Sequence, residues 1–389
     1  MDIDPEHAKR VFVEKLKNRV RLLTEGAVIM VCPVLLAASL NKVQTTSNGH
    51  GFARGSISPL SALTLVAGLL SFLCLCICLS FRIVTDRVAH FLFVGSKWLV
   101  HLCALLLMAL ALGILLLVDR KHVYYVPIPG VSIFFVLWRC WKMYQHDHGR
   151  DAMLYSGDQQ DRLETSVDFS VSVTALLFLG LEGLALEGQS RSAQRLRAAS
   201  LVLSFIACLA GVLFMLLATV PPMITCVAQS NTACNYIEAM NKFLAGFFAL
   251  NVFLITWAPL GELAWLVWIQ LLVSLLAWAY ESLTNNERQD EQQHVTPATM
   301  ELTKVISAGF LAVSVPAVSN KSVSGFTCAF VLITGTAVIT GILWRVLTDW
   351  TPAGSSMIKA VNFACFCTHL YVCAAVIPFS FMAYNALMS

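Results

Sequence analysis

The chain has 389 residues, of which 58% are hydrophobic and only 13% are charged, and its formal net charge is +3. Soluble globular proteins carry about 25% charged residues, so this chain has too little polar surface to cover a fold of its size in water. The composition excludes a soluble globular protein and predicts an integral membrane protein whose apolar surface contacts the lipid bilayer.

Residues 1–21 combine apolar residues at helical spacing with basic residues that lie largely off that stripe. Asp4 and Pro5 are residue types that favour the cap and the first position of a helix. We predict a cytoplasmic amphipathic segment on the anionic inner leaflet, with anionic lipid as a partner. The alternative is a solvated leader that only sets orientation. The stripe consists of Ala8, Val11, Phe12, Leu16, Val20 and Leu23, and the basic residues are Lys9, Arg10, Lys15, Lys17 and Arg19.

Eleven apolar runs follow along the chain. Most approach or exceed the ~20 residues that a helix needs to cross a ~30 Å hydrocarbon layer. The sequence therefore predicts an all-α, polytopic integral membrane protein with about 11 transmembrane helices. The weakest run, 128–144, carries Arg139 and Lys142. The runs are 22–40, 60–81, 91–118, 128–144, 168–188, 198–220, 242–259, 262–281, 304–319, 323–346 and 361–386.

A pentapeptide that recurs at the ends of two long apolar runs indicates internal repeats. It reads "RIVTD" at 82–86 and "RVLTD" at 345–349, and the preceding segments 23–42 and 302–321 align without a gap. A diverged middle copy begins with "RLET" at 162–165. The matching residues Thr24, Thr165 and Thr303 are expected to cap the first helix of each repeat, because a threonine hydroxyl accepts free backbone N–H groups there.

These matches predict three repeats in a 4+4+3 arrangement of helices, as in transporters built from repeats. The predicted segments are the N-terminal segment 1–21, repeat 1 at 22–144, a cytoplasmic linker at 145–161, repeat 2 at 162–282, a cytoplasmic linker at 283–300, and repeat 3 at 301–389.

Lys and Arg favour the cytoplasmic side of a membrane protein, and eleven crossings with a cytoplasmic N-terminus place most of them there. We expect a plasma membrane or an endomembrane as the location. Two segments disagree with this orientation. Segment 189–197 carries three arginines but is placed outside, and segment 226–234 resembles an extracellular disulfide loop but is placed in the cytosol, where thiols stay reduced. Cys226 and Cys234 are therefore candidates for a disulfide.

Polar groups inside the apolar runs are the candidates for an ion or solute path. Glu182 in "LGLEGLAL" lies between small residues, and the alternative is a protonated or hydrogen-bonded carboxyl that fixes helix packing. His101 and His369 occupy matching positions in repeats 1 and 3; they either face a path or bond to a neighbouring carbonyl. Asn251 is a further candidate, with ordinary interhelical hydrogen bonding as its alternative.

Charged residues at matching repeat positions are candidates for contacts between repeats. Arg82 and Asp86 correspond to Arg345 and Asp349 in the pentapeptide. In addition, Glu25 and Lys304 carry opposite charges directly after the matching threonines, which suggests a clamp that orients the repeats.

The function predicted from these features is a channel or transporter for an ion or small solute, with a path between the repeats. The first alternative is a non-transporting scaffold or signalling component, since few charges lie inside the helices. A lipid-modifying transferase that uses His101 or His369 is the third reading. We expect no enzyme activity, no cofactor and no metal site, because nucleotide-binding glycine patterns and histidine-rich boxes are absent from the sequence. Nothing points to nucleic acid, and a homo-oligomer is an expected assembly.

Overall fold

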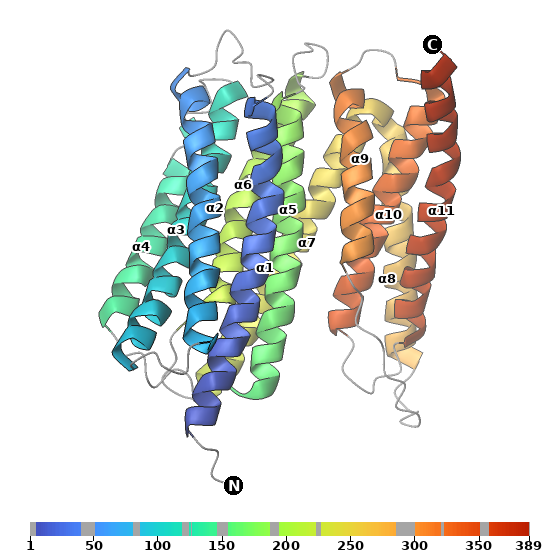
Figure 1. Ribbon diagram of the computed structural model, residues 1–389. Helices are drawn as coiled ribbons and strands as arrows, with labels where there is room; N and C mark the ends of the chain where they lie inside the picture. Colours follow the sequence, from blue (N-terminus) through green and yellow to red (C-terminus); the bar gives the residue numbers. More distant parts are fainter. Residues whose placement is uncertain are drawn as a thin grey trace. The chain divides into compact units, whose positions relative to one another are not determined.

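The computed structural model contains eleven α-helices among the residues that it describes, and no strand occurs in those residues (Figure 1). The all-helical fold class is therefore confirmed. The described residues are 5–39, 51–80, 86–118, 124–125, 127–145, 155–186, 194–222, 227–284, 300–319, 323–350 and 358–388. The helices are α1 (Pro5–Ser39), α2 (Gly51–Ser80), α3 (Asp86–Val118), α4 (Pro127–Gln145), α5 (Gly157–Leu186), α6 (Gln194–Thr219), α7 (Val227–Leu260), α8 (Leu266–Thr284), α9 (Glu301–Ser319), α10 (Gly325–Trp350) and α11 (Ile358–Met388).

Eight helical stretches of the described chain are long and apolar enough to cross a membrane, which supports an integral membrane protein. The predicted count of about eleven crossings is not confirmed. One stretch, Gln229–Ala277, contains both α7 and α8, and the apolar part of α4 covers only Pro127–Arg139. The count of eleven and the three repeats therefore stay predictions.

The chain forms two compact units. Unit 1 comprises Met1–Leu186 and Ser204–Leu244, and unit 2 comprises Glu187–Leu203 and Ala245–Ser389. Helices α6 and α7 therefore contribute residues to both units. None of the predicted repeat boundaries coincides with this division.

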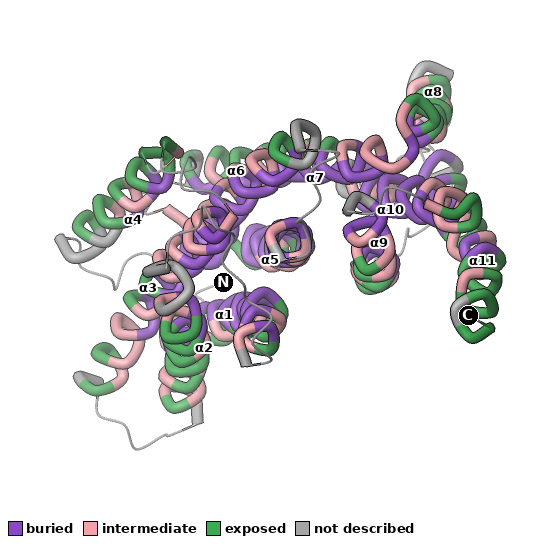
Figure 2. Tube along the Cα trace, turned by 90° about the horizontal axis from the view of Figure 1, so that it is seen from above, coloured by how far each residue is buried: buried purple, intermediate pink, exposed green. Residues whose placement is uncertain are grey.

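Within unit 1, α5 is the central helix. Helices α1 and α3 pack against it, α6 approaches it where Gly211 meets Thr174, and α7 reaches it through Asn241. Asn241 Nδ2 donates to the Ser166 carbonyl oxygen at 3.0 Å. Of the candidate membrane spans, α5 has the largest buried share, and Figure 2 shows it among α1, α3, α6 and α7. Polar groups in the second half of α5, such as Thr174 and Glu182, therefore lie inside unit 1.

Helix α1 is continuous from Pro5 to Ser39, so the predicted boundary after residue 21 falls inside it. Helices α2 and α5 pack against α1. Four members of the predicted apolar stripe are thus buried against protein in the structure, whereas Val11 is exposed, and the anionic lipid partner stays a prediction. The buried members of the stripe are Phe12, Leu16, Val20 and Leu23.

Thr24 lies in the middle of α1, so the prediction that it caps a helix start is wrong. Its hydroxyl is 2.8 Å from the Val20 carbonyl oxygen and 3.2 Å from the Gly68 carbonyl oxygen of α2. Because small residues let helices in a membrane approach closely, such contacts tighten the helix pairs. The same contact between a threonine and a glycine of the next helix recurs at Thr174–Gly211 in α5 and α6 and at Thr303–Gly341 in α9 and α10.

Arg139 of α4 is placed at the end of α6. Its Nη2 donates to the Val220 carbonyl oxygen at 2.7 Å, and Tyr155 Oη donates to the Pro222 carbonyl oxygen at 2.9 Å. The last carbonyls of a helix lack intrahelical donors and attract cations. Arg139 thereby stabilises the C-terminal end of α6.

Within unit 2, α10 is packed by α8, α9 and α11. Its residues Leu343 and Leu347 form an apolar core with Val361 and Ala364 of α11. Helix α7 is joined to α8 by η3 (Gly261–Trp265), a short 3-10 helix. Gly261 has a φ of 58°, a left-handed conformation that glycine adopts without strain, and it allows the chain to turn there.

A reciprocal pair of serines joins α2 to α3. Ser71 Oγ donates to the Ser96 carbonyl oxygen at 3.1 Å, and Ser96 Oγ donates to the Ser71 carbonyl oxygen at 3.0 Å. We expect Ser96→Ala to lower the free energy of unfolding by about 1 kcal/mol, because it removes one buried hydrogen bond. The measurement is thermal unfolding in detergent. Ser380→Ala is the control, because Ser380 is exposed and bonds within its own helix; an equal loss in both variants would contradict the role of the pair.

Candidate functional site

The first part of the candidate site is Glu182, on the central helix of unit 1. Its side chain is only 3% exposed. Neither of its carboxyl oxygens has a hydrogen-bond partner among the described residues. Cys208 of α6 is close enough for the two groups to interact electrostatically. The sequence prediction thus identified a carboxyl group that the structure buries.

Burial of Glu182 without a partner carries a free-energy cost. A buried polar group that lacks a hydrogen bond costs about 1–3 kcal/mol, and an isolated buried charge costs much more. A bound proton or a bound cation would offset this cost. Intramembrane carboxyl groups with such a need are typical of ion and proton pathways.

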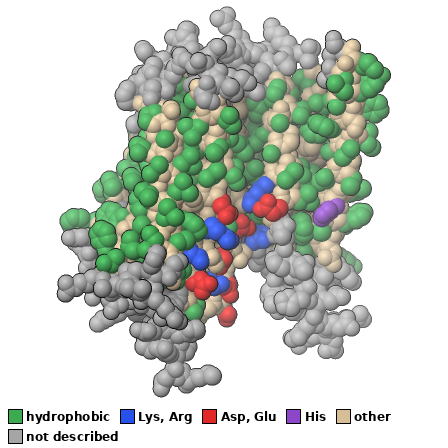
Figure 3. All heavy atoms as spheres, viewed as in Figure 1, with side chains coloured by type: hydrophobic (Ala, Val, Ile, Leu, Met, Phe, Trp, Pro, Cys, Tyr) green, Lys and Arg blue, Asp and Glu red, His purple; other side chains and the backbone are tan. Residues whose placement is uncertain are grey.

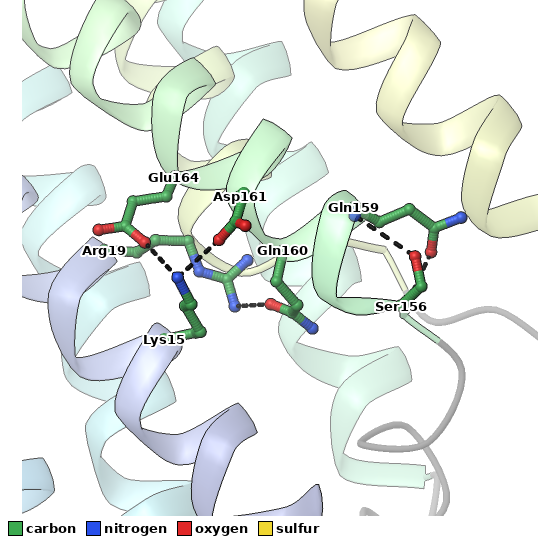
Figure 4. A network of polar contacts seen from close by, with 7 residues as sticks. All are labelled: Lys15, Arg19, Ser156, Gln159, Gln160, Asp161 and Glu164. Carbon is green, nitrogen blue, oxygen red and sulfur yellow. Dashed lines mark hydrogen bonds and ion pairs between the residues drawn. The ribbon is translucent and has the colours of Figure 1, made fainter.

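The second part of the candidate site is a polar cluster between α1 and α5 (Figure 4). Lys15 Nζ is 2.6 Å from Asp161 Oδ1 and 3.4 Å from Glu164 Oε2. One turn further along α1, Arg19 Nη2 donates to Gln160 Oε1 at 3.0 Å. Figure 3 shows Lys, Arg, Asp and Glu side chains gathered on a face that is otherwise mostly hydrophobic. Segments about 145 residues apart therefore assemble one cluster.

The cluster continues onto α7. Arg162 Nε donates to Glu238 Oε1 at 2.7 Å, and its Nη2 donates to Asn235 Oδ1 at 2.8 Å. Gln159 Nε2 donates to Asn231 Oδ1 at 2.6 Å. Successive residues at the start of α5 thus bind α1 on one side and α7 on the other.

Glu164 and Glu182 connect the two parts of the site along α5. They are 18 residues apart, which is five turns, so both lie on the same face about 27 Å apart along the axis. That length is close to the ~30 Å thickness of a hydrocarbon layer. An ionisable group therefore stands near each end of one buried helix face.

His101 is buried in α3 and bonds within its own helix. Its Nδ1 donates to the Lys97 carbonyl oxygen at 2.7 Å. Lys97 lies over the ring of Phe93, 4.4 Å from the centroid. This hydrogen bond agrees with the alternative in which the histidine bonds to a neighbouring carbonyl.

The two other predicted path residues belong to unit 2. His369 is exposed on α11, and its Nδ1 donates to the Cys365 carbonyl oxygen at 2.8 Å. Its ring stacks edge-on against Trp344 at 5.9 Å. Asn251 is buried, and its Oδ1 accepts a hydrogen bond from Ser200 Oγ at 3.0 Å. The two histidines thus share the same bond to the fourth preceding residue but differ in exposure.

The residues predicted to join the repeats are only partly described. Arg82 lies outside the described residues, as do the side chains of Asp86 and Asp349. Arg345 of α10 is buried. The proposed clamp partners each have an ion pair within their own helix: Glu25 with Arg21 at 3.5 Å, and Lys304 with Glu301 at 2.9 Å.

Cys234, one of the two residues predicted to form a disulfide, is a buried free thiol. Cys226 lies outside the described residues. The part of the chain that the structure describes contains no group of three or more His, Cys, Asp or Glu side chains that could hold a metal ion.

No protein family, no curated protein and no solved structure matches the chain. The candidate site is therefore defined by its own geometry. The sequence prediction identified Glu182 but missed Lys15, Arg19 and Glu164. The sequence did contain a signal for this cluster. Basic residues lie near the start of α1 and acidic residues lie near the start of α5, and both starts were expected on the same side of the membrane.

Proposed function

We propose that the protein transports an ion or a small solute across a membrane, and that Glu182 binds the transported proton or cation. The burial of the Glu182 carboxyl group, with no hydrogen-bond partner in the part of the chain that the structure describes, carries this proposal. A purely structural carboxyl group in a helix bundle normally has a hydrogen-bond partner, because an unsatisfied one destabilises the fold.

The position of Glu182 on α5 supports the same function. Because α5 is the central helix of unit 1, a group that moves an ion along it is shielded from lipid. The cluster around Glu164 supplies a second ionisable position on the same helix face. Two such positions near opposite ends of a span suit entry and exit of an ion.

The test is proton flux into liposomes that contain the purified protein and a trapped pH-sensitive dye. A potassium gradient with valinomycin drives the flux. Wild-type protein is expected to acidify the lumen, and Glu182→Gln is expected to reduce the rate about tenfold or more, because the neutral amide does not take up a proton at neutral pH and attracts a cation less strongly than a carboxylate does.

Glu25→Gln is the matched control, since Glu25 is exposed on α1 and pairs within its own helix. It is expected to keep the wild-type rate. Sodium and potassium flux are measured in the same liposomes with ion-sensitive dyes. If wild-type protein moves none of these ions, or if Glu182→Gln keeps the full rate, the proposal is wrong and the scaffold alternative is favoured.

A further inference from the structure

The guanidinium group of Arg19 is the most isolated charge in the cluster of unit 1. Arg19 is 0% exposed. Among the described residues, its one hydrogen bond runs from Nη2 to the neutral amide oxygen of Gln160 at 3.0 Å. Nε and Nη1, which together carry three N–H donors, have no hydrogen-bond partner within the described ranges of the chain. A fully buried cation with one neutral partner is strongly destabilising unless an acceptor completes its environment.

The carboxylates of the cluster are held by the neighbouring lysine. Lys15 contacts both Asp161 and Glu164, and no ion pair joins Arg19 to either carboxylate among the described residues. Glu164 acts on the charge of Arg19 only through space. Figure 4 shows the Arg19 guanidinium beside Gln160, with Lys15 between the two carboxylates. The acceptor that Arg19 needs is thus missing from the described side chains.

We propose that Arg19 binds a small oxyanion, a carboxylate or a phosphate group, in the interior of unit 1. A guanidinium fork binds such a group through two parallel hydrogen bonds, which a neutral acceptor or a spherical ion uses less well. The described side chain that contacts the guanidinium group is Gln160 of α5, whose amide oxygen lies 3.0 Å from Arg19 Nη2. Complete burial restricts the ligand to a small group.

The separation of the charges, not their sum, favours an anion at Arg19, because the four charges cancel but both carboxylates contact Lys15. Lys15 and Arg19 together carry two positive charges, while Asp161 and Glu164 carry two negative charges on the exposed side of the cluster. A bound oxyanion places a negative charge directly against the buried guanidinium, where the low local dielectric strengthens the attraction. This inference does not depend on ion binding at Glu182.

The test is ligand-dependent thermal unfolding of the purified full-length protein in detergent, followed by tryptophan fluorescence. Sodium acetate, sodium phosphate and sodium chloride are titrated separately at constant ionic strength. A ligand that binds only the folded state raises the melting temperature in a saturable manner. We expect acetate or phosphate to raise it by about 2 °C or more in the wild-type protein, and chloride to raise it less.

Arg21→Gln is the matched control, because Arg21 lies one half-turn away on α1, is exposed and pairs with Glu25. It is expected to keep the full response, whereas Arg19→Gln is expected to lose it. If Arg19→Gln does not fold, Arg19→Lys takes its place, because lysine keeps the positive charge but lacks the guanidinium fork. Its half-saturation concentration for radiolabelled acetate, measured by equilibrium dialysis, is expected to be at least tenfold higher than that of the wild type.

A second arm separates the two sources of an oxyanion. Micelles doped with phosphatidylglycerol are compared with micelles doped with phosphatidylcholine. A response to phosphatidylglycerol that needs Arg19 and exceeds the response to free phosphate assigns the site to a lipid headgroup. If neither oxyanion nor anionic lipid shifts the wild-type melting temperature, or if Arg19→Gln responds as the wild type does, the inference is overturned.

Discussion

Replacing Glu182 by leucine is expected to raise the free energy of unfolding by about 1–3 kcal/mol, because the variant no longer buries a carboxyl group without a partner. Leucine has a similar volume and fills the same space on α5. Among buried ionic groups, replacement by a well-packed apolar residue is often neutral or stabilising. The measurement is the midpoint of thermal or denaturant unfolding in detergent, for wild type and variant at the same protein concentration.

Glu182→Gln separates polarity from ionisation in the same experiment. The amide is as unsatisfied as the protonated acid at this position, so its unfolding midpoint is expected to stay near the wild-type value. Both variants are expected to lose ion flux. A stabilised but inactive leucine variant is the pattern of a residue retained for function at a cost in stability.

The opposite result has an equally clear meaning. If Glu182→Leu lowers the free energy of unfolding by more than about 1 kcal/mol, the carboxyl group makes a structural bond in the membrane. That outcome would contradict the arrangement in which both oxygens lack a partner, and it would favour a packing role for Glu182.

The hydrophobicity of the sequence predicted where the helices lie along the chain, but it did not predict where each helix ends or which of its faces is buried. Each of the eleven predicted apolar runs overlaps one helix of the structure. The largest difference is at α1, where the amphipathic helix predicted to begin near Pro5 and the apolar run from residue 22 form one continuous helix. The charged first half of α1 was predicted to lie on a membrane surface, because hydropathy alone does not show which other helices contact a segment. In the structure, Lys15 of this segment pairs with Asp161 and Glu164 of α5.

The cluster of unit 1 depends on which helices are neighbours. Lys15 and Asp161 are 146 residues apart, and no local pattern places them side by side. Glu182 was found because a lone acid in an apolar run is conspicuous without any knowledge of packing. The exposure of His369 was missed for a related reason, since α11 is apolar on all sides and its sequence does not reveal its buried face.

The close contact of α1 with α5 can be tested at Gly26. A Cβ atom on Gly26 would overlap the Cγ1 methyl group of Val171 and lie 3.5 Å from its Cβ. Valine in a helix has one strongly preferred rotamer, so its side chain cannot turn away at low cost. We expect Gly26→Ala to lower the free energy of unfolding by about 1–3 kcal/mol, the cost of overpacking a buried contact.

The rescuing change is Val171→Ala, which removes the obstructing methyl groups. By itself it is expected to destabilise by about 1 kcal/mol, since it leaves a small cavity between α1 and α5. Combined with Gly26→Ala, the new methyl group occupies that space, and the two effects should couple favourably by about 1–2 kcal/mol. Thermal unfolding of the two single variants and the double variant gives this coupling energy.

Gly95→Ala on α3 is the control for the helical effect of the substitution, because nothing lies within 4 Å of a Cβ atom at Gly95. It is expected to leave stability unchanged or to raise it by up to about 1 kcal/mol, as alanine restricts the unfolded chain. If Gly26→Ala behaves like Gly95→Ala, or if its effect simply adds to that of Val171→Ala, then α1 does not pack against α5 at the contact of Gly26 with Val171. The Lys15 and Arg19 cluster, which needs the same two helices side by side, would lose its support as well.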